Sequence, residues 1–388
     1  MPLPIKPKGP PPRRKKGPPE ASPEQLLCRA RGTLLGLAVG SAFGMPLEFK
    51  KLPSAQFPTL NEGMHVDVRG GGPFSLKRGQ VTHDAQLAVC LAVSLRNLRR
   101  YDVLDTAKDY ARWMPHAFDV GTQVKGALEL VAEGKHPEFT GKRVWLESNQ
   151  KAAGNGSIAR CVPIGVFFRW DQQARILATL EDAAITHFSP QCQLAGVIIN
   201  AVIAAANTTP KEKLDKADAL KAIEAELSIA ASQLGRIQPD WVTQVKDAAD
   251  WLREDIRAAQ DDDPMLYGPE LHMHLRETWV RVCVRLALWE LWHAPTFEAA
   301  LVDVVNRGGD ADTNGAVVGA LMGAVHGDTA IPEHWATPVL EVNGPGPLFG
   351  KYHPREMMTL AQNLLDRPAA AVKPPPPSRK DSGGSHSD

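Results

Sequence analysis

The sequence is poor in the features that mark all-β, disulfide-rich and secreted proteins. Aromatic residues make up 6% of the 388 residues, and stretches in which apolar and polar residues alternate are rare, which disfavours sandwiches and barrels. The five cysteines are odd in number, widely spaced and without a Cys-x-x-Cys pair. We therefore expect buried, reduced thiols in a reducing compartment.

The chain also has no net charge and no long apolar run. The formal charge is zero, and the positive charge is concentrated at the two ends, so the body is not predicted to bind nucleic acid or another polyanion. The basic N-terminus has no apolar stretch typical of a signal peptide. The longest apolar run, Leu194 to Ala206, is too short to span a bilayer. These absences predict a soluble cytoplasmic protein without a membrane partner.

Composition divides the chain into a central body and two tails. Residues 1–22 contain eight prolines and six basic residues, and residues 367–388 have a similar composition. Neither segment can bury a core, so we expect both to be disordered or polyproline-like. The first tail has two interpretations, a docking arm for a protein partner or phosphates and, as the preferred one, a solubilising linker. Residues 23–366 are predicted to form one domain.

The body shows helical periodicity almost throughout. Ser22-Pro23-Glu24-Gln25 is typical of a capping box at the start of a helix. Apolar residues then recur with helical spacing in most of the later segments, which predicts a single all-α domain of about a dozen helices with no doubly wound sheet. The helices expected after the first one cover residues 84–99, 105–116, 122–133, 157–168, 172–185, 190–206, 211–234, 238–259, 275–293, 296–306 and 313–326.

Two of these helices contain small residues at regular intervals. Gly36, Gly40 and Gly44 lie in the first, and Gly319 and Gly323 lie in the last. Because glycine weakens a helix by up to ~1 kcal/mol per site, its repeated use predicts a close approach between helices around a central site.

The strongest chemical motif is Gly308-Gly309-Asp310-Ala311-Asp312-Thr313. The two glycines allow a sharp turn, and two carboxylates and a hydroxyl then converge where the loop enters a helix. Clustered oxygen ligands suit Mg²⁺ or Mn²⁺. An ordinary aspartate N-cap would explain one of the acids, but it would not explain the whole set, so a metal site is predicted.

Three further segments carry weaker signals. Thr82, His83 and Asp84 precede a helix and could act as an ordinary cap and first-turn acid. The Gly154-Asn155-Gly156-Ser157 turn could present backbone N–H groups to a phosphate, with Arg160 adding charge, or could be a plain turn. Glu48 and His187 are by themselves more typical of a surface acid and a core histidine.

The order of these segments resembles that of the ADP-ribosylglycohydrolase family, which includes the dinitrogenase reductase-activating glycohydrolases. The matching segments are Gly36–Gly44 with Pro46 and Glu48, Gly70–Phe74, Gly79–Gln86, Asp119–Thr122, Gly154–Arg160 with Pro163, Thr186-His187 and Gly308–Thr313. The resemblance implies a large orthogonal multi-helix domain with a central binuclear Mg²⁺ or Mn²⁺ cleft. It also implies a metal-dependent hydrolase that removes ADP-ribose from modified arginine or serine side chains, with ADP-ribosylated protein or ADP-ribose as its partner.

The resemblance also implies roles for individual residues. Glu48 and Asp84 are the expected catalytic carboxylates. The expected metal ligands are Thr82, His83, Asp84, Asp310, Asp312 and Thr313. The residues expected to bind ADP-ribose are Asp119, Gly121, Gly154, Asn155, Gly156, Ser157 and His187.

One segment departs from the family pattern. Where the family usually has Thr-Asp-Asp-Thr, this chain has Thr82-His83-Asp84-Ala85, and Ser41 stands where aspartate is frequent. Imidazole favours softer ions than magnesium. Three outcomes follow: His83 ligates a softer metal, the site holds one ion instead of two, or the protein binds ADP-ribose without hydrolysing it. The last outcome would make the chain a degenerate ADP-ribose-binding protein or one that antagonises a transferase, as in immunity.

Overall fold

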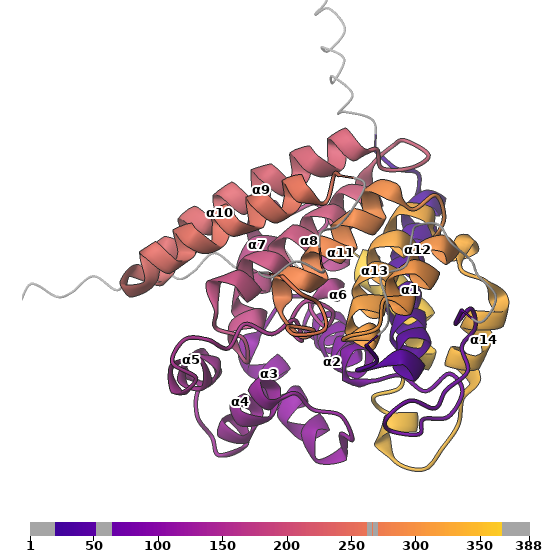
Figure 1. The fold of residues 1–388 in the computed structure, drawn as a ribbon, viewed down its shortest axis with the longest axis horizontal. Coiled ribbons are helices and arrows are strands. Elements are labelled where there is room, and N and C mark those ends of the chain that lie inside the picture. The colour runs from indigo at the N-terminus through magenta and orange to yellow at the C-terminus, as the bar shows by residue number, and fades with distance from the viewer. Residues whose placement is uncertain (1–19, 52–63, 262–265, 267–270, 367–388) are drawn as a thin grey trace, which may run out of the picture.

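The computed structural model describes residues 20–51, 64–261, 266 and 271–366. Within these residues it contains fifteen α-helices, six short 3₁₀-helices and isolated β-bridges, but no β-strand. The prediction of an all-α domain is therefore confirmed (Figure 1). The predictions for the tails, including the docking arm, fall almost entirely outside the described residues.

Most helices follow one another through short connections, whereas longer segments separate η1 from α2 and α10 from α11. The α-helices are α1 (Pro23–Gly44), α2 (His83–Leu98), α3 (Val103–Trp113), α4 (Thr122–Ala132), α5 (Pro137–Glu147), α6 (Val162–Phe167), α7 (Gln172–Ala184), α8 (Pro190–Thr208), α9 (Lys216–Ile237), α10 (Val242–Ala258), α11 (Val280–His293), α12 (Phe297–Asn306), α13 (Ala311–His326), α14 (Glu333–Glu341) and α15 (Met357–Leu365). The 3₁₀-helices are η1 (Met45–Leu47), η2 (Met114–His116), η3 (Pro239–Trp241), η4 (Asp328–Ala330), η5 (Pro347–Phe349) and η6 (Pro354–Glu356).

The start of α1 has the predicted capping box. The Gln25 backbone N–H donates to Ser22 Oγ at 3.2 Å, and the Ser22 backbone N–H donates to Gln25 Oε1 at 2.9 Å. Pro23 occupies the first helical position, where no N–H is needed. Local sequence thus fixes where the domain's central helix begins.

Glycines bring α1 and α13 together along most of their length, and Figure 1 shows the two helices side by side. A Cβ added at Gly36 would lie 2.1 Å from the Gly319 carbonyl oxygen, and one at Gly40 would lie 1.9 Å from that of Gly315. Only glycine allows backbones to approach this closely. Because the helices run antiparallel, the C-terminal end of α1 meets the N-terminal end of α13, and the predicted close approach is confirmed.

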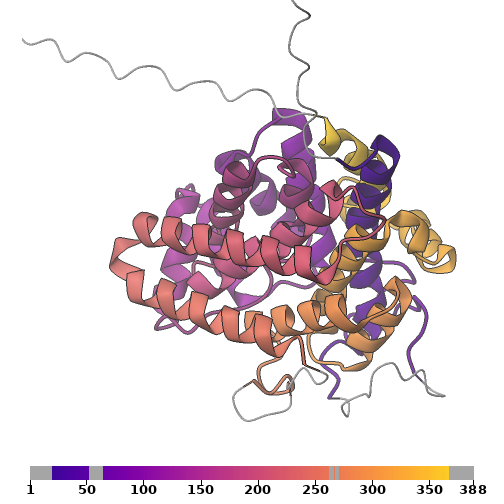
Figure 2. The ribbon, with the colours of Figure 1, turned by 90° about the horizontal axis from the view of Figure 1, so that it is seen from above.

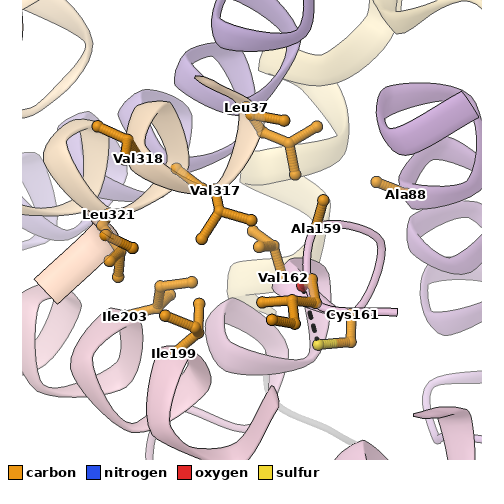
Figure 3. Close-up of a cluster of buried hydrophobic side chains, with 14 of the residues drawn as sticks. Leu37, Ala88, Ala159, Cys161, Val162, Ile199, Ile203, Val317, Val318 and Leu321 are labelled. Atoms are coloured by element: carbon orange, nitrogen blue, oxygen red, sulfur yellow. Dashed lines mark hydrogen bonds between the residues drawn. The ribbon is translucent and has the colours of Figure 1, made fainter. Parts of the chain in front are cut away.

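Apolar side chains from several helices fill the space beside this pair. Leu37 of α1, Val317 and Leu321 of α13 and Ile199 and Ile203 of α8 belong to one buried cluster (Figure 3). The antiparallel helices α9 and α10 lie along one side of the molecule (Figure 2). By length and composition Pro23–Leu47 and Pro190–Thr208 could cross a membrane, but 78% and 83% of their apolar windows are buried within the protein, as in core helices.

Some elements differ from the sequence prediction. The helix expected over 157–168 is confined to Val162–Phe167, and residues 157–161 form turns. There the backbone makes bonds three residues apart, such as Ile158 N–H to the Asn155 carbonyl, so no α-helix starts. The helices α5, α14 and α15 were not predicted. The cysteines agree with expectation, because all five are free and only Cys28 is not fully buried.

Candidate metal centre

Two loops pair to bring the predicted carboxylates together. The Phe49 N–H donates to the Gly309 carbonyl at 2.7 Å, and the Gly309 N–H donates to the Lys50 carbonyl at 3.0 Å. Gly308 and Gly309 both have positive φ, at 73° and 66°, which glycine adopts without strain. The pairing places Glu48 against the start of α13, where its Oε2 accepts from the Asp312 N–H at 3.1 Å.

The acids form two clusters that share one residue. Glu48, Asp310 and Asp312 make the first cluster, and His83, Asp84 and Asp312 make the second. Within each cluster one possible ligand atom from every residue lies within 4.8 Å of the others. Asp84 Oδ1 and Asp312 Oδ2 are buried and have no hydrogen-bond partner among the described residues. Buried carboxylate oxygens without partners are costly, and bound cations are the usual compensation.

The hydroxyl groups support Asp84 and do not cap helices. Thr82 and Asp310 occupy the N-cap positions of α2 and α13, but neither side chain makes a capping bond. Asp84 Oδ2 instead accepts from Thr82 Oγ1 at 3.4 Å and from Thr313 Oγ1 at 3.2 Å. Ser41 Oγ lies 2.9 Å from Thr82 Oγ1 and accepts from the Thr82 N–H. The expected positions at the helix starts are confirmed, with Asp84 and Asp312 in the first turns, but the side-chain capping bonds of the plain-cap interpretation are absent.

His83 lies between carboxylates. Its Nδ1 is 3.1 Å from Asp119 Oδ2, and its Nε2 is 3.6 Å from Asp84 Oδ1. Burial opposes protonation of the ring, but Asp84, Asp119 and Asp312 together raise the pKa of His83 well above its usual range. The imidazole therefore takes part in the acidic centre and does not point away from it.

Burial and mutual repulsion raise the pKa values of the acids. Burial, followed by the charges of Asp312 and Asp310, raises the pKa of Glu48 well above its ordinary value. Burial, with Asp312 and Asp119 adding to it and His83 opposing it, raises the pKa of Asp84 to about 7. Burial, followed by the charge of Asp312, raises the pKa of Asp310 well above its ordinary value. Without a cation, this cluster of acids resists full ionisation.

A cavity of about 280 Å³ opens above the acids. Asp119, Gly121, Gly154, Asn155, Gly156 and His187 line it together with Glu48, His83, Asp310, Asp312 and Thr313. The Asn155 Nδ2 donates to Asp310 Oδ2 at 2.9 Å, which connects the glycine-rich turn to the second metal motif. Thr82 and Asp84 lie buried beneath the wall, and Ser157 is also buried and does not line the cavity.

A chain of hydrogen bonds fixes the orientation of His187. Arg160 Nη1 donates to Thr186 Oγ1 at 2.7 Å, so the Thr186 hydroxyl proton is free to go to His187 Nδ1, 2.7 Å away. With Nδ1 accepting, the ring proton of His187 is on Nε2, which lies near Gly154 and Gly156 on the cavity wall. Burial, Arg160 and His83 lower the pKa of His187 well below its usual range. A neutral ring that donates through Nε2 suits an oxygen-rich ligand.

The suggestion that Arg160 adds charge at a phosphate is wrong. The side chain is fully buried and pairs with Asp182, whose carboxylate also accepts from the Tyr110 hydroxyl. Two of the cavity residues that the sequence analysis missed make hydrogen bonds to the glycine-rich turn. Gln123 Oε1 accepts from the Gly154 N–H at 2.9 Å, and the Thr278 carbonyl accepts from the Asn155 N–H at 3.0 Å. Gln123 lies beside the Gly121 segment, whereas nothing around Thr278 signals a site.

A second and larger cavity of about 440 Å³ lies between α5, α7 and the end of α9. Its wall includes Phe139, Phe188 and Trp241 and is mainly apolar. Among the described residues no candidate metal-binding group lines it, so the smaller cavity is the candidate site.

Comparisons with known proteins identify the family of the chain. A sequence profile of the ADP-ribosylglycohydrolase family matches residues 22–372. The chain is 29% identical over 332 residues to the ADP-ribosylarginine hydrolase Tri1 of Serratia proteamaculans, covering 82% of this chain and 77% of that protein. It is also 29% identical over 310 residues to the ADP-ribosyl-[dinitrogen reductase] glycohydrolase of Rhodospirillum rubrum, covering 79% of this chain and 88% of that protein.

A solved structure described as an ADP-ribosylglycohydrolase-related protein complex matches with a TM-score of 0.61 and 25% identity, covering 88% of this chain and 98% of that one. The family profile spans the whole body of the chain, including every segment that forms the acidic centre. The chain belongs to the ADP-ribosylglycohydrolase family.

Proposed function

We propose that the protein is a metal-dependent hydrolase that releases ADP-ribose from modified protein side chains. Arginine is the favoured linkage, because two of the relatives, from Serratia proteamaculans and Pseudomonas putida, are named ADP-ribosylarginine hydrolases, and serine is the alternative. The observation that carries the proposal is the cluster of Glu48, Asp310 and Asp312 in the wall of one cavity, with the buried Asp84 joined to it through the shared residue Asp312. ADP-ribosylated proteins are thus the proposed partners, and the cytoplasm the proposed location.

The residues of the centre fit divalent ions. Glu48, Asp310 and Asp312 supply only oxygen ligands, the donor type that Mg²⁺ and Mn²⁺ prefer. The unpartnered oxygens Asp84 Oδ1 and Asp312 Oδ2 are explained if each faces a cation. When bound, such ions would orient ribose hydroxyls and lower the pKa of a coordinated water.

Glu48 is placed to handle a proton at the reacting bond. Its carboxyl group is buried on the cavity wall, and its Oε2 accepts a hydrogen bond from the Asp312 backbone N–H. Without a cation, burial and the neighbouring acids raise the pKa of Glu48, and a carboxyl group on the cavity wall can exchange a proton with a bound substrate. Hydrolysis of the N- or O-glycosidic bond requires a proton to be removed from the attacking water and one to be given to the leaving group.

The upper wall is suited to hold the nucleotide part of the substrate. Gly154 and Gly156 keep the wall free of side chains, because a Cβ at Gly154 would lie 2.7 Å from Gln123 Oε1 and one at Gly156 would lie 3.4 Å from the His187 ring. His187 Nε2 donates toward the cavity, where a ribose or phosphate oxygen could accept. Asn155 orients Asp310 and so connects the binding wall to the acidic floor.

A release assay tests the proposal. The full chain is incubated with peptides ADP-ribosylated on arginine or on serine, in Mg²⁺ or Mn²⁺, and free ADP-ribose is measured by mass spectrometry. Release from the arginine peptide is expected. Asp310→Asn, which keeps the side-chain volume, is expected to abolish it, and its melting temperature controls for folding. Failure to release ADP-ribose from either peptide by folded, metal-loaded protein would exclude the hydrolase.

The position of His83 favours a second candidate, an ADP-ribose-binding protein without turnover. An imidazolium between Asp84 and Asp119 could neutralise the acids in place of an ion. This candidate predicts ADP-ribose binding without release, and a gain of activity in His83→Asp/Ala85→Thr. Release by the natural sequence at a rate equal to that of the double variant would remove its basis.

A further inference from the structure

The two clusters of the acidic centre differ in the kind of ligand atoms they offer. The cluster of Glu48, Asp310 and Asp312 is all oxygen, whereas the cluster of His83, Asp84 and Asp312 contains an imidazole nitrogen. Asp312 belongs to both. A nitrogen ligand shifts preference away from Mg²⁺ and toward Zn²⁺, Co²⁺ and neighbouring first-row ions. The two positions are therefore not chemically equivalent.

Asp119 holds the His83 ring in the orientation that a metal ligand needs. A carboxylate only accepts hydrogen bonds, so Asp119 Oδ2, 3.1 Å from Nδ1, fixes the proton on that nitrogen. The other nitrogen, Nε2, then faces Asp84 Oδ1 at 3.6 Å. Metal-bound histidines characteristically donate their second ring N–H to a carboxylate in this way.

The spacing and the unpartnered oxygens agree with a shared ion. Ligand atoms that lie about 2.1 Å from one ion are about 3–3.5 Å apart, close to the separation of Nε2 and Asp84 Oδ1. Asp84 is completely buried and Asp312 nearly so, and each has one oxygen without a hydrogen-bond partner in the part of the chain that the structure describes. Both residues belong to the same cluster as His83.

We propose that the centre is a mixed-metal site, in which His83, Asp84 and Asp312 bind an ion of the Zn²⁺ or Co²⁺ class and Glu48, Asp310 and Asp312 bind Mg²⁺ or Mn²⁺. Asp312 bridges the two positions and Asp119 positions the His83 ring. The inference rests on the metal dependence in the proposed function. It assigns His83 as a metal ligand that this chain has in place of a carboxylate.

Metal content read without any substrate tests the inference. The full chain is stripped with a chelator and dialysed against buffered Zn²⁺ with excess Mg²⁺, and bound ions are counted by elemental analysis. About one Zn²⁺ per chain is expected. His83→Asp is expected to lose this zinc, whereas His334→Asp, which removes an exposed histidine of α14, is expected to keep it. Equal zinc in the natural protein and in His83→Asp, or no zinc in either, would overturn the proposal.

Two further measurements keep the test decisive if His83→Asp fails to fold. X-ray absorption of the zinc-loaded natural protein should show an imidazole nitrogen at about 2.0–2.1 Å, and an all-oxygen shell would refute the role of His83. Asp119→Asn, a positioning variant, should weaken Co²⁺ binding about 10–100-fold, and unchanged affinity would refute the role of Asp119. Because none of these readouts uses turnover, absence of hydrolysis would count against the proposed function alone.

Discussion

Gly40 lies where α1 and α13 approach each other closely. The substitution Gly40→Ala adds one methyl group there and tests whether the helices can remain at this distance. A Cβ at Gly40 would lie 1.9 Å from the Gly315 carbonyl oxygen and 2.4 Å from its carbonyl carbon. Carbon and carbonyl oxygen normally approach to about 3.3 Å, so the backbones would have to separate by about 1.4 Å in Gly40→Ala. Both contact atoms belong to the backbone, so no side-chain rotation can relieve the clash.

The expected cost is large, because the helices must move apart along a tightly packed interface. Overpacking a core typically costs 1–3 kcal/mol, and we expect a value of about 3 kcal/mol or more here. With an unfolding entropy of about 2.1 cal/mol/K per residue over about 350 residues, this lowers the Tm by about 4 °C. Glu48 follows the end of α1 and Asp312 lies at the start of α13, so both belong to the same end of the helix pair. Metal uptake should therefore also fall.

Thermal unfolding followed by circular dichroism, with and without Mn²⁺, measures both effects. Gly126→Ala in α4 is the matched control, since its Cβ would meet only Val144 Cγ2, at 3.3 Å, a half-buried side chain that can shift. We expect it to change stability by less than about 1 kcal/mol. If Gly40→Ala melted within a degree of Gly126→Ala and bound metal equally well, the argument for the close helix approach would be wrong.

Four further changes have directions that the structure fixes. Asn155→Leu removes the amide that orients Asp310, so initial rates at saturating Mg²⁺ should fall about 10–100-fold; an unchanged rate would contradict this role. Thr186→Val removes the donor to His187 Nδ1, so KM should rise about 10-fold with a smaller change in kcat, while Thr186→Ser should behave like the natural protein. Arg160→Met strands the buried Asp182 and should cost about 3–5 kcal/mol in denaturant unfolding; a loss below about 1 kcal/mol would refute the pairing. In protein stripped of metal with a chelator, burial raises the pKa of Asp84 to about 7, so the folded state binds more protons than the unfolded state. Thermal stability should therefore fall as the pH rises from about 4 through 7. The fall should be smaller in Asp84→Asn.

Local sequence was enough to predict the elements whose signals are short-range. The Ser22–Gln25 capping box is present, and Gly36, Gly40 and Gly44, spaced four residues apart, lie on one face of α1 against α13. Both features were predictable because a cap and a helix face depend on residues that are near neighbours in the sequence. The helix predicted from apolar periodicity over residues 157–161 is absent. These residues are buried on all sides, so their apolar pattern fits a turn as well as a helix.

The motif Gly308–Thr313 contains two acids within a few residues and therefore identified half of the acidic centre. The residues that contact the centre from other segments are brought there by tertiary structure. Asp119 lies 36 positions from His83, and Asn155 lies 155 positions from Asp310, so neither contact can be read from spacing. Arg160 shows the opposite error. Its charge beside a glycine-rich turn indicated phosphate binding, but Asp182, 22 residues later, neutralises it in the core.

Asp312 belongs to both clusters, so one variant at this residue tests the central claim most directly. Asp312→Asn and the natural protein are compared for bound divalent ions and for release of ADP-ribose from an arginine-linked peptide. The account predicts that the natural protein binds metal and releases ADP-ribose only with metal present, and that Asp312→Asn, while folded, does neither. Metal-dependent release by Asp312→Asn at the rate of the natural protein would contradict the account.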